Sequence, residues 1–199
     1  MAKLYYHFIH KEELEEHDIT AMYQMIEMYY ENVNPTRFLR VLAGKDYVFF
    51  VRDEEGNICA FTTLQVIHII RKKQKLKGLL LGDVVASERY GNDDRIEHIF
   101  ADAVIEYRKR KKKTEEKYIF ANCKDYKAYK MFASSFSHVY PCQKEDTPKH
   151  LKKVINAFRE HYCNQGFDVA FFQGVENQAE RCDMVCIAEC VDTNMIPTV

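Results

Sequence analysis

The 199-residue sequence has no apolar run approaching the roughly 18 residues that a membrane-spanning helix needs. Its first residues, Met-Ala-Lys-Leu-Tyr-Tyr-His, lack the apolar core of a secretory signal. An excess of charge is also missing, because 29 basic and 30 acidic side chains leave a formal charge of −1. No global field therefore recruits nucleic acid or an anionic membrane. We expect a cytoplasmic protein that binds neither.

The signatures of several common sites are absent too. The sequence contains no H-E-x-x-H motif, no G-x-S-x-G elbow and no Walker-type loop. Its seven cysteines are an odd number without a C-x-x-C pair, and many lie among apolar residues. This pattern favours buried thiols in a reducing compartment over a disulfide framework. Cys182, Cys186 and Cys190 share a spacing of four, but no paired histidines accompany them, so we predict no metal site.

The stretch Lys77 to Cys123 is the most informative part of the chain. It predicts a central strand over Leu79–Ala86, a polar break, a helix with its apolar face over Ile96–Tyr107, and a return strand over Tyr118–Cys123. Acidic residues precede the helix and a basic run follows it, which matches the helix dipole better than it indicates a nucleic-acid site. Strand, helix and strand form a βαβ unit, whose first loop is the usual place for a ligand.

Periodicity and turn residues predict the remaining elements. Thr147 is the expected N-cap of an added helix, and Pro148 its first residue. We predict an α/β fold, with a mixed, mostly antiparallel, twisted sheet of about six or seven strands and helices on both faces. Residues 1–199 form one domain, with the extra helix inserted before the last strands. The expected elements are a strand at 3–10, helices at 19–30 and 36–42, a hairpin of 47–52 and 58–68, helices at 126–136 and about 148–162, and strands at 167–172 and 184–190.

This order of elements resembles the GNAT superfamily of N-acetyltransferases. The segment Val85-Ala86-Ser87 stands where the family's central strand ends and a phosphate-binding loop begins. The resemblance implies that acetyl-CoA binds there, with the N–H groups of Val84 and Val85 polarising the thioester carbonyl. It also implies that Gly91, Asn92 and Arg95 hold the pyrophosphate at the helix N-terminus, where free donors and the dipole favour anions.

A second similarity lies downstream, where an asparagine is followed seven residues later by a tyrosine. These residues are Asn122 and Tyr129. The resemblance implies that Asn122 binds the cofactor arm and that Tyr129 is the general acid for the departing thiolate. Packing of Tyr129 in a helix and a turn role for Asn122 are the structural alternatives. Asp83, on the central strand, is a candidate general base because burial would raise its pKa, although an outward-facing carboxylate explains it equally simply.

The loop also departs from the family pattern. The family's glycines would fall on Asn92, Asp93, Asp94 or Arg95, and only Gly91 remains. An acidic side chain beside a pyrophosphate costs roughly 1 kcal/mol per charge pair at about 4 Å, even in bulk water. If the loop amides converge at the helix N-terminus, an enzyme is favoured. If an aspartate side chain fills that position, loss of cofactor binding is favoured.

Two functions therefore remain open. The first is an acyl-CoA-dependent N-acyltransferase, using acetyl-CoA, that acts on a primary amine of a small molecule or peptide. The second is a GNAT-fold binding or regulatory module that has lost acetyl-CoA binding and catalysis. The last strands could also pair across a homodimer.

Overall fold

The computed structural model describes residues 3–29, 33–71, 74–82, 84–91, 93–111, 115–123, 126–142, 145–160 and 184–189. The strands are β1 (Tyr5–His10), β2 (Tyr47–Arg52), β3 (Ile58–Arg71), β4 (Gln74–Leu81), β5 (Val85–Ala86), β6 (Tyr118–Cys123), β7 (Val139–Tyr140) and β8 (Met184–Glu189). The helices are a 3-10 turn (Lys11–Glu13), α1 (Glu16–Tyr29), α2 (Pro35–Ala43), α3 (Asp94–Glu97), α4 (Ile99–Arg110), α5 (Tyr126–Ser135) and α6 (Lys149–Phe158). In the described part of the chain, no helix is both long and apolar enough to cross a bilayer.

All eight strands belong to one sheet with the order β1-β2-β3-β4-β6-β8-β7, and β5 pairs with β3 beside this path. Only the β4–β6 pairing is parallel, as the predicted βαβ unit requires. The mixed, mostly antiparallel sheet is therefore confirmed. The described part of the chain has eight strands rather than six or seven, because the predicted central strand is split into β4 and β5 and because Val139–Tyr140 also pairs, against Ile187 and Ala188.

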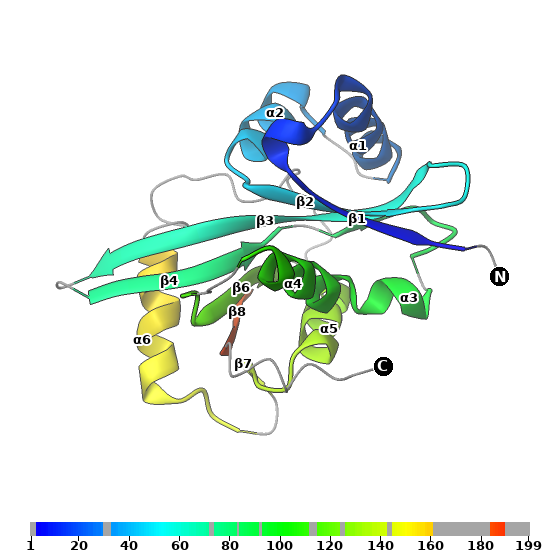
Figure 1. The fold of residues 1–199 in the computed structure, drawn as a ribbon. Helices are drawn as coiled ribbons and strands as arrows, with labels where there is room; N and C mark the ends of the chain where they lie inside the picture. Colours follow the sequence, from blue (N-terminus) through cyan, green and yellow to red (C-terminus); the bar gives the residue numbers. More distant parts are fainter. Residues whose placement is uncertain are drawn as a thin grey trace.

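Helices cover both faces of the sheet (Figure 1). On one face α1 and α2 pack over β2 and β3, with Met22, Phe38 and Phe50 fully buried between them. On the other face α4 and α5 cover the middle strands, through residues such as Phe100 and Phe132. The alternation of apolar residues in β2, where Val48 and Phe50 face α1 while Phe49 and Val51 face α4, decides this layering.

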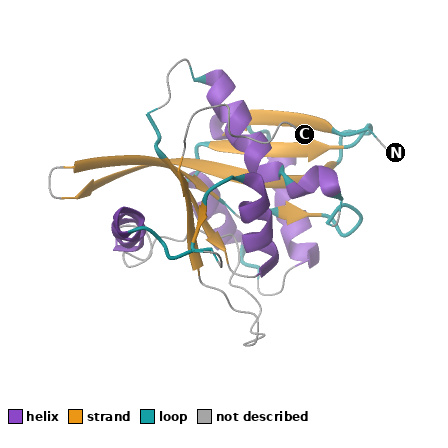
Figure 2. Cartoon of the chain, turned by 90° about the horizontal axis from the view of Figure 1, so that it is seen from below, coloured by secondary structure: helices purple, strands orange, loops and turns teal. Residues whose placement is uncertain are grey.

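The far ends of β3 and β4 form a two-stranded arm that projects beyond the rest of the sheet (Figure 2). Helix α6 covers one face of this arm. The Phe158 ring of α6 stacks on Phe120 of β6, with centroids 4.6 Å apart and planes at 10°. Ile67, Ile69 and Leu80 complete the contact, so the added helix has its own apolar core under the arm.

Several local predictions need correction. The central strand is interrupted after Leu81, and the predicted helix is split at His98 into α3 and α4. Pro148 is the N-cap of α6 rather than its first residue, and it makes no side-chain capping bond. The strand predicted at 167–172 lies outside the described residues.

Candidate functional site

The interruption of the central strand is a β-bulge opposite β3. Leu81 pairs with Leu64, and Val85 pairs with Phe61. The stretch from Leu81 to Val85 is therefore one residue longer than the stretch of β3 from Phe61 to Leu64 opposite it, which defines a bulge. Gly82 is required at its start because an added Cβ would lie 2.0 Å from Thr63 Oγ1. The Gly82 N–H donates to the Thr63 carbonyl at 2.8 Å, which fixes the start of the bulge.

The bulge determines which backbone N–H groups point away from β3. The Ser87 N–H donates to the Cys59 carbonyl at 2.9 Å, so the N–H of Val85, two residues earlier, also points toward β3. Ala86 alternates with them and turns its N–H toward the β6 side. Val84 lies within the bulge, opposite a position that forms no ladder bond. The structure thus moves one predicted donor from Val85 to Ala86 and keeps Val84 as a candidate.

Beyond the bulge the two central strands diverge. The parallel ladder between β4 and β6 ends at the pair Leu81–Ala121. After this point β5 follows β3, whereas β6 continues with β8 through Asn122 and Cys123. Among the described residues no ladder joins β5 to β6, and backbone groups that a continuous ladder would have paired can bind a ligand.

In the loop after β5, backbone N–H groups donate hydrogen bonds to acceptors within the same loop. Tyr90 donates to Ser87, and Asp93 donates to Tyr90, at 2.9 and 3.0 Å. The Asp93 side chain caps α3 by accepting the Arg95 N–H at 2.9 Å. It also forms an ion pair with the Arg95 guanidinium at 2.6 Å, which lowers the pKa of the Asp93 carboxyl. A carboxylate of the chain itself therefore occupies the start of α3.

A cavity of about 290 Å³ lies between this loop and α5. Of the residues predicted to bind the cofactor, Gly91 lines this cavity, and Arg95 does not. Three carboxylates, one lysine and two apolar side chains make up the rest of the lining. The lining residues are Gly91, Asp93, Asp94, Ile96, Glu97, Lys130 and Met131.

Tyr129 is half-buried, and its hydroxyl donates to the Pro141 carbonyl at 3.0 Å. Burial, followed by the nearby thiols of Cys186, Cys142 and Cys123, raises its pKa above the usual value for a phenol. A higher pKa makes the hydroxyl a weaker acid, and the bond to Pro141 has to break before the proton reaches any other acceptor. The general-acid role therefore stays a prediction that requires a rearrangement.

Asn122 and Tyr129 do not act on the same face of the sheet. In β6, Ala121 and Cys123 face the core under α5, where Tyr129 packs. Asn122 alternates with them and shares the orientation of Phe120, which faces α6. The spacing of seven residues does not predict this, because only the pleat of β6 decides which face each side chain takes.

Two predicted residues, Asp83 and Asn92, lie outside the described residues. Other residues were not singled out from the sequence. Lys130 and Glu97 line the cavity from α5 and α3. Asp102 of α4 is half-buried, and burial raises its pKa, an effect that the His98 side chain opposes. The sequence carries no signal for Asp102, because at 100° per residue it falls with His98 and Glu106 on the polar side of the predicted helix.

The two ends of an acyl-CoA fit the site unequally. The diverging strands offer backbone donors for a thioester carbonyl. At the loop, however, the amides of Tyr90, Gly91, Asp93, Arg95 and Ile96 all have partners within the loop. Carboxylates also dominate the adjacent cavity, which opposes a pyrophosphate. In this conformation the loop does not fit a pyrophosphate group.

The sequence matches no protein-family profile and no curated protein. Solved structures do match. A GCN5-related glucosamine N-acetyltransferase region of a fungal multi-domain β-N-acetylglucosaminidase aligns with a TM-score of 0.53 and 13% identity, over 81% of this chain and 21% of that chain. YhbS, a GNAT family N-acetyltransferase from Escherichia coli in complex with CoA, aligns with a TM-score of 0.48 and 11% identity, over 69% of this chain and 70% of that chain. A probable N-acyltransferase from Enterococcus faecalis aligns with a TM-score of 0.48 and 12% identity, over 67% of this chain and 33% of that chain.

The chain thus spans a third or less of the fungal and Enterococcus proteins. At these identities the likeness concerns the fold alone. The strand order, the bulged and diverging central strands and the helices on both faces agree with it. The chain has the fold of the GNAT superfamily.

Proposed function

We propose that the protein transfers an acyl group from an acyl thioester, with acetyl-CoA as the first donor to test, to a primary amine. The observation that carries this proposal is the divergence of β5 from β6 directly after the bulge. It leaves the Ala86 N–H, together with the candidate Val84 N–H, on the side from which β6 has diverged. Such fixed donors stabilise the oxyanion that forms when an amine attacks a thioester.

Backbone and side-chain groups of the chain would bind the carbonyl and protonate the leaving group. The diverging strands would hold the carbonyl against Val84 and Ala86, so that the neutral amine attacks directly. As the C–N bond forms and the C–S bond breaks, the attacking amine gives up a proton to water. The departing thiolate needs a proton, and Tyr129 supplies it only after its hydroxyl leaves the Pro141 carbonyl. Because the raised pKa of Tyr129 weakens this donor, solvent competes with it. The acceptor amine remains defined by its class alone.

A second candidate rests on a different observation. Asp93 caps α3 and pairs with Arg95, so a carboxylate lies at the loop where the family resemblance implies a pyrophosphate. This arrangement favours a binding module that has lost acetyl-CoA. The first candidate requires that acetyl-CoA displaces the Asp93 side chain from the start of α3, and the second requires that Asp93 stays there.

Thermal unfolding with and without millimolar acetyl-CoA separates them, with free CoA as a comparison. A ligand at 100 times its dissociation constant adds about 2.7 kcal/mol to the free energy of unfolding. In a chain of this length each kcal/mol raises the unfolding midpoint by about 2–4 °C. The midpoint should therefore rise by roughly 5–11 °C if the donor binds.

Asp93→Asn serves as the diagnostic variant, because asparagine keeps the cap but not the charge. Asp94→Asn removes the same charge from the rim of the same cavity and is the matched control. A shift in the wild type supports acyl transfer. A shift in Asp93→Asn alone supports the module. No shift in any of the three proteins rejects acetyl-CoA as a ligand.

A further inference from the structure

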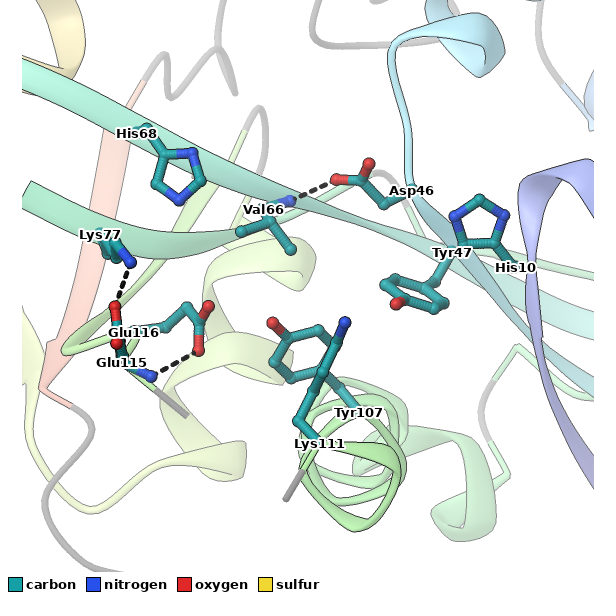
Figure 3. A pocket seen from close by; sticks show the side chains of 10 residues that line it. All are labelled: His10, Asp46, Tyr47, Val66, His68, Lys77, Tyr107, Lys111, Glu115 and Glu116. Atoms are coloured by element: carbon teal, nitrogen blue, oxygen red, sulfur yellow. Dashed lines mark hydrogen bonds and ion pairs between the residues drawn. The ribbon is translucent and has the colours of Figure 1, made fainter. Parts of the chain in front are cut away.

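A second cavity, of about 500 Å³, lies at the other end of α4 from the loop (Figure 3). It forms where the parallel pairing of β4 and β6 brings Lys77 beside the segment that precedes β6, since the Lys117 N–H donates to the Lys77 carbonyl at 3.1 Å. Side chains from β1, β2, β3, β4 and α4 reach it. None of the residues assigned to the acyl-transfer site lines it.

Aromatic rings form one wall of this cavity. The Tyr47 and Tyr107 rings meet edge to face, with centroids 5.6 Å apart and planes at 75°. His10 adds a third ring, edge-on to Tyr47 at 5.2 Å. The Lys111 ammonium lies 5.9 Å from the Tyr47 centroid and 6.0 Å from the Tyr107 centroid. The two tyrosines therefore already hold an ammonium, near the roughly 6 Å limit of a cation–π contact.

Two carboxylates of this cavity are held in place by the fold. Asp46 accepts the Val66 N–H at 2.7 Å. Glu116 accepts the Glu115 N–H at 3.1 Å and lies beside the Tyr107 hydroxyl. Burial, followed by the charge of Glu116 and its hydrogen bonding, raises the pKa of Tyr107. Tyr107 thus stays protonated and fixes the carboxylate that faces it.

The charge balance favours a cation. Lys77 and Glu115 form an ion pair and largely cancel each other. Asp46 and Glu116 then outnumber Lys111, and α4 ends here, with the negative pole of its dipole. In the described part of the chain, the Lys111 ammonium contacts the two ring faces, and its side chain is exposed. A ligand can therefore displace it without breaking an ion pair.

We propose that this cavity is a ligand site for a primary organic ammonium ion and that the Lys111 ammonium is its resident occupant. The ligand places its charge over Tyr47 and Tyr107 and donates hydrogen bonds to the Glu116 carboxylate. Its alkyl part lies against Val66. The proposal is independent of acyl transfer, since the site lies at the opposite end of α4.

An NMR titration of the full chain with n-butylammonium chloride tests this. Lys111→Ala removes the resident ammonium and should tighten binding roughly fivefold, the effect of one like charge in a watery site. Lys109→Ala removes the same charge from the same helix, but Lys109 pairs with Glu106 and does not line the cavity. It should leave the affinity unchanged within about twofold.

Glu116→Gln should weaken binding roughly tenfold, because a charge-assisted hydrogen bond is lost. Tetramethylammonium, which cannot donate hydrogen bonds, should bind more weakly than n-butylammonium and lose less affinity than n-butylammonium on Glu116→Gln, because only the Coulomb attraction is removed. Thermal unfolding of each variant verifies that it is folded. The proposal is overturned if Lys111→Ala weakens n-butylammonium binding, or leaves it unchanged. It is also overturned if inorganic phosphate binds the wild type here and Lys111→Ala abolishes that binding.

Discussion

Substitution of Gly82 by alanine tests the packing that creates the bulge. The new Cβ would lie 2.0 Å from Thr63 Oγ1 and 3.3 Å from Thr63 Cβ. Thr63 is fully buried, and its hydroxyl has no hydrogen-bond partner in the part of the chain that the structure describes. Because the Gly82 backbone is tied to the Thr63 carbonyl at 2.8 Å, it cannot easily move away.

Overpacking of this kind costs about 1–3 kcal/mol. A loss of about 2 kcal/mol would lower the unfolding midpoint by roughly 4–8 °C in a chain of this length. Urea unfolding followed by circular dichroism measures the loss, since the sequence has no tryptophan to report by fluorescence. Gly44→Ala is the matched control. Its Cβ would lie 3.4 Å from the nearest atom, and its φ of −77° suits alanine, so the change should stay within about 0.5 kcal/mol.

Thr63→Ala supplies the second half of a double-mutant cycle. Alone it removes a buried hydroxyl that has no partner among the described residues. The stability gained by no longer burying this hydroxyl offsets much of the stability lost with the methyl burial. Combined with Gly82→Ala it opens the space that the new Cβ needs, so the double variant should be more stable than the sum of the two losses by at least about 1 kcal/mol. Wild-type stability of Gly82→Ala, or additive losses in the double variant, would refute this account of the bulge.

Three further changes test other parts of the structure. Asp93→Asn should cost about 1 kcal/mol at pH 7, because it keeps the cap but loses the ion pair with Arg95. The lowered pKa of Asp93 stabilises the folded state above the ordinary carboxyl pKa of about 4, so the gap to the wild type should close as the pH falls below that value; an equal gap at pH 7 and 3 would contradict this. Arg52→Ala leaves the Asp18 carboxylate, 8% exposed, without the guanidinium 2.5 Å away, and should cost about 3 kcal/mol in urea unfolding, but less when combined with Asp18→Ala. Phe158→Ala removes the ring stacked on Phe120 and should cost about 3–5 kcal/mol, whereas a loss below about 1 kcal/mol would mean that α6 is peripheral.

The sequence alone determined those elements whose signals are local. The strand Tyr118–Cys123 has its predicted bounds, and the hairpin of β2 and β3 begins and ends within a few residues of the prediction. Apolar periodicity and a glycine-containing turn act over a few residues, so they can be read without knowledge of tertiary contacts. The parallel βαβ unit followed from the length of its crossover.

Only the tertiary structure decided the chemistry of the site. The register of β3, through Thr63, splits the central strand and turns the N–H of Val85 toward β3 and that of Ala86 away from it. The sequence allowed an aspartate at the helix N-terminus, but only the structure shows that Asp93 is the residue that caps α3. The second cavity exists because the β4–β6 ladder brings Lys77 beside a segment about 40 residues later in the chain. Register and burial set these juxtapositions, and both depend on partners that local patterns do not name.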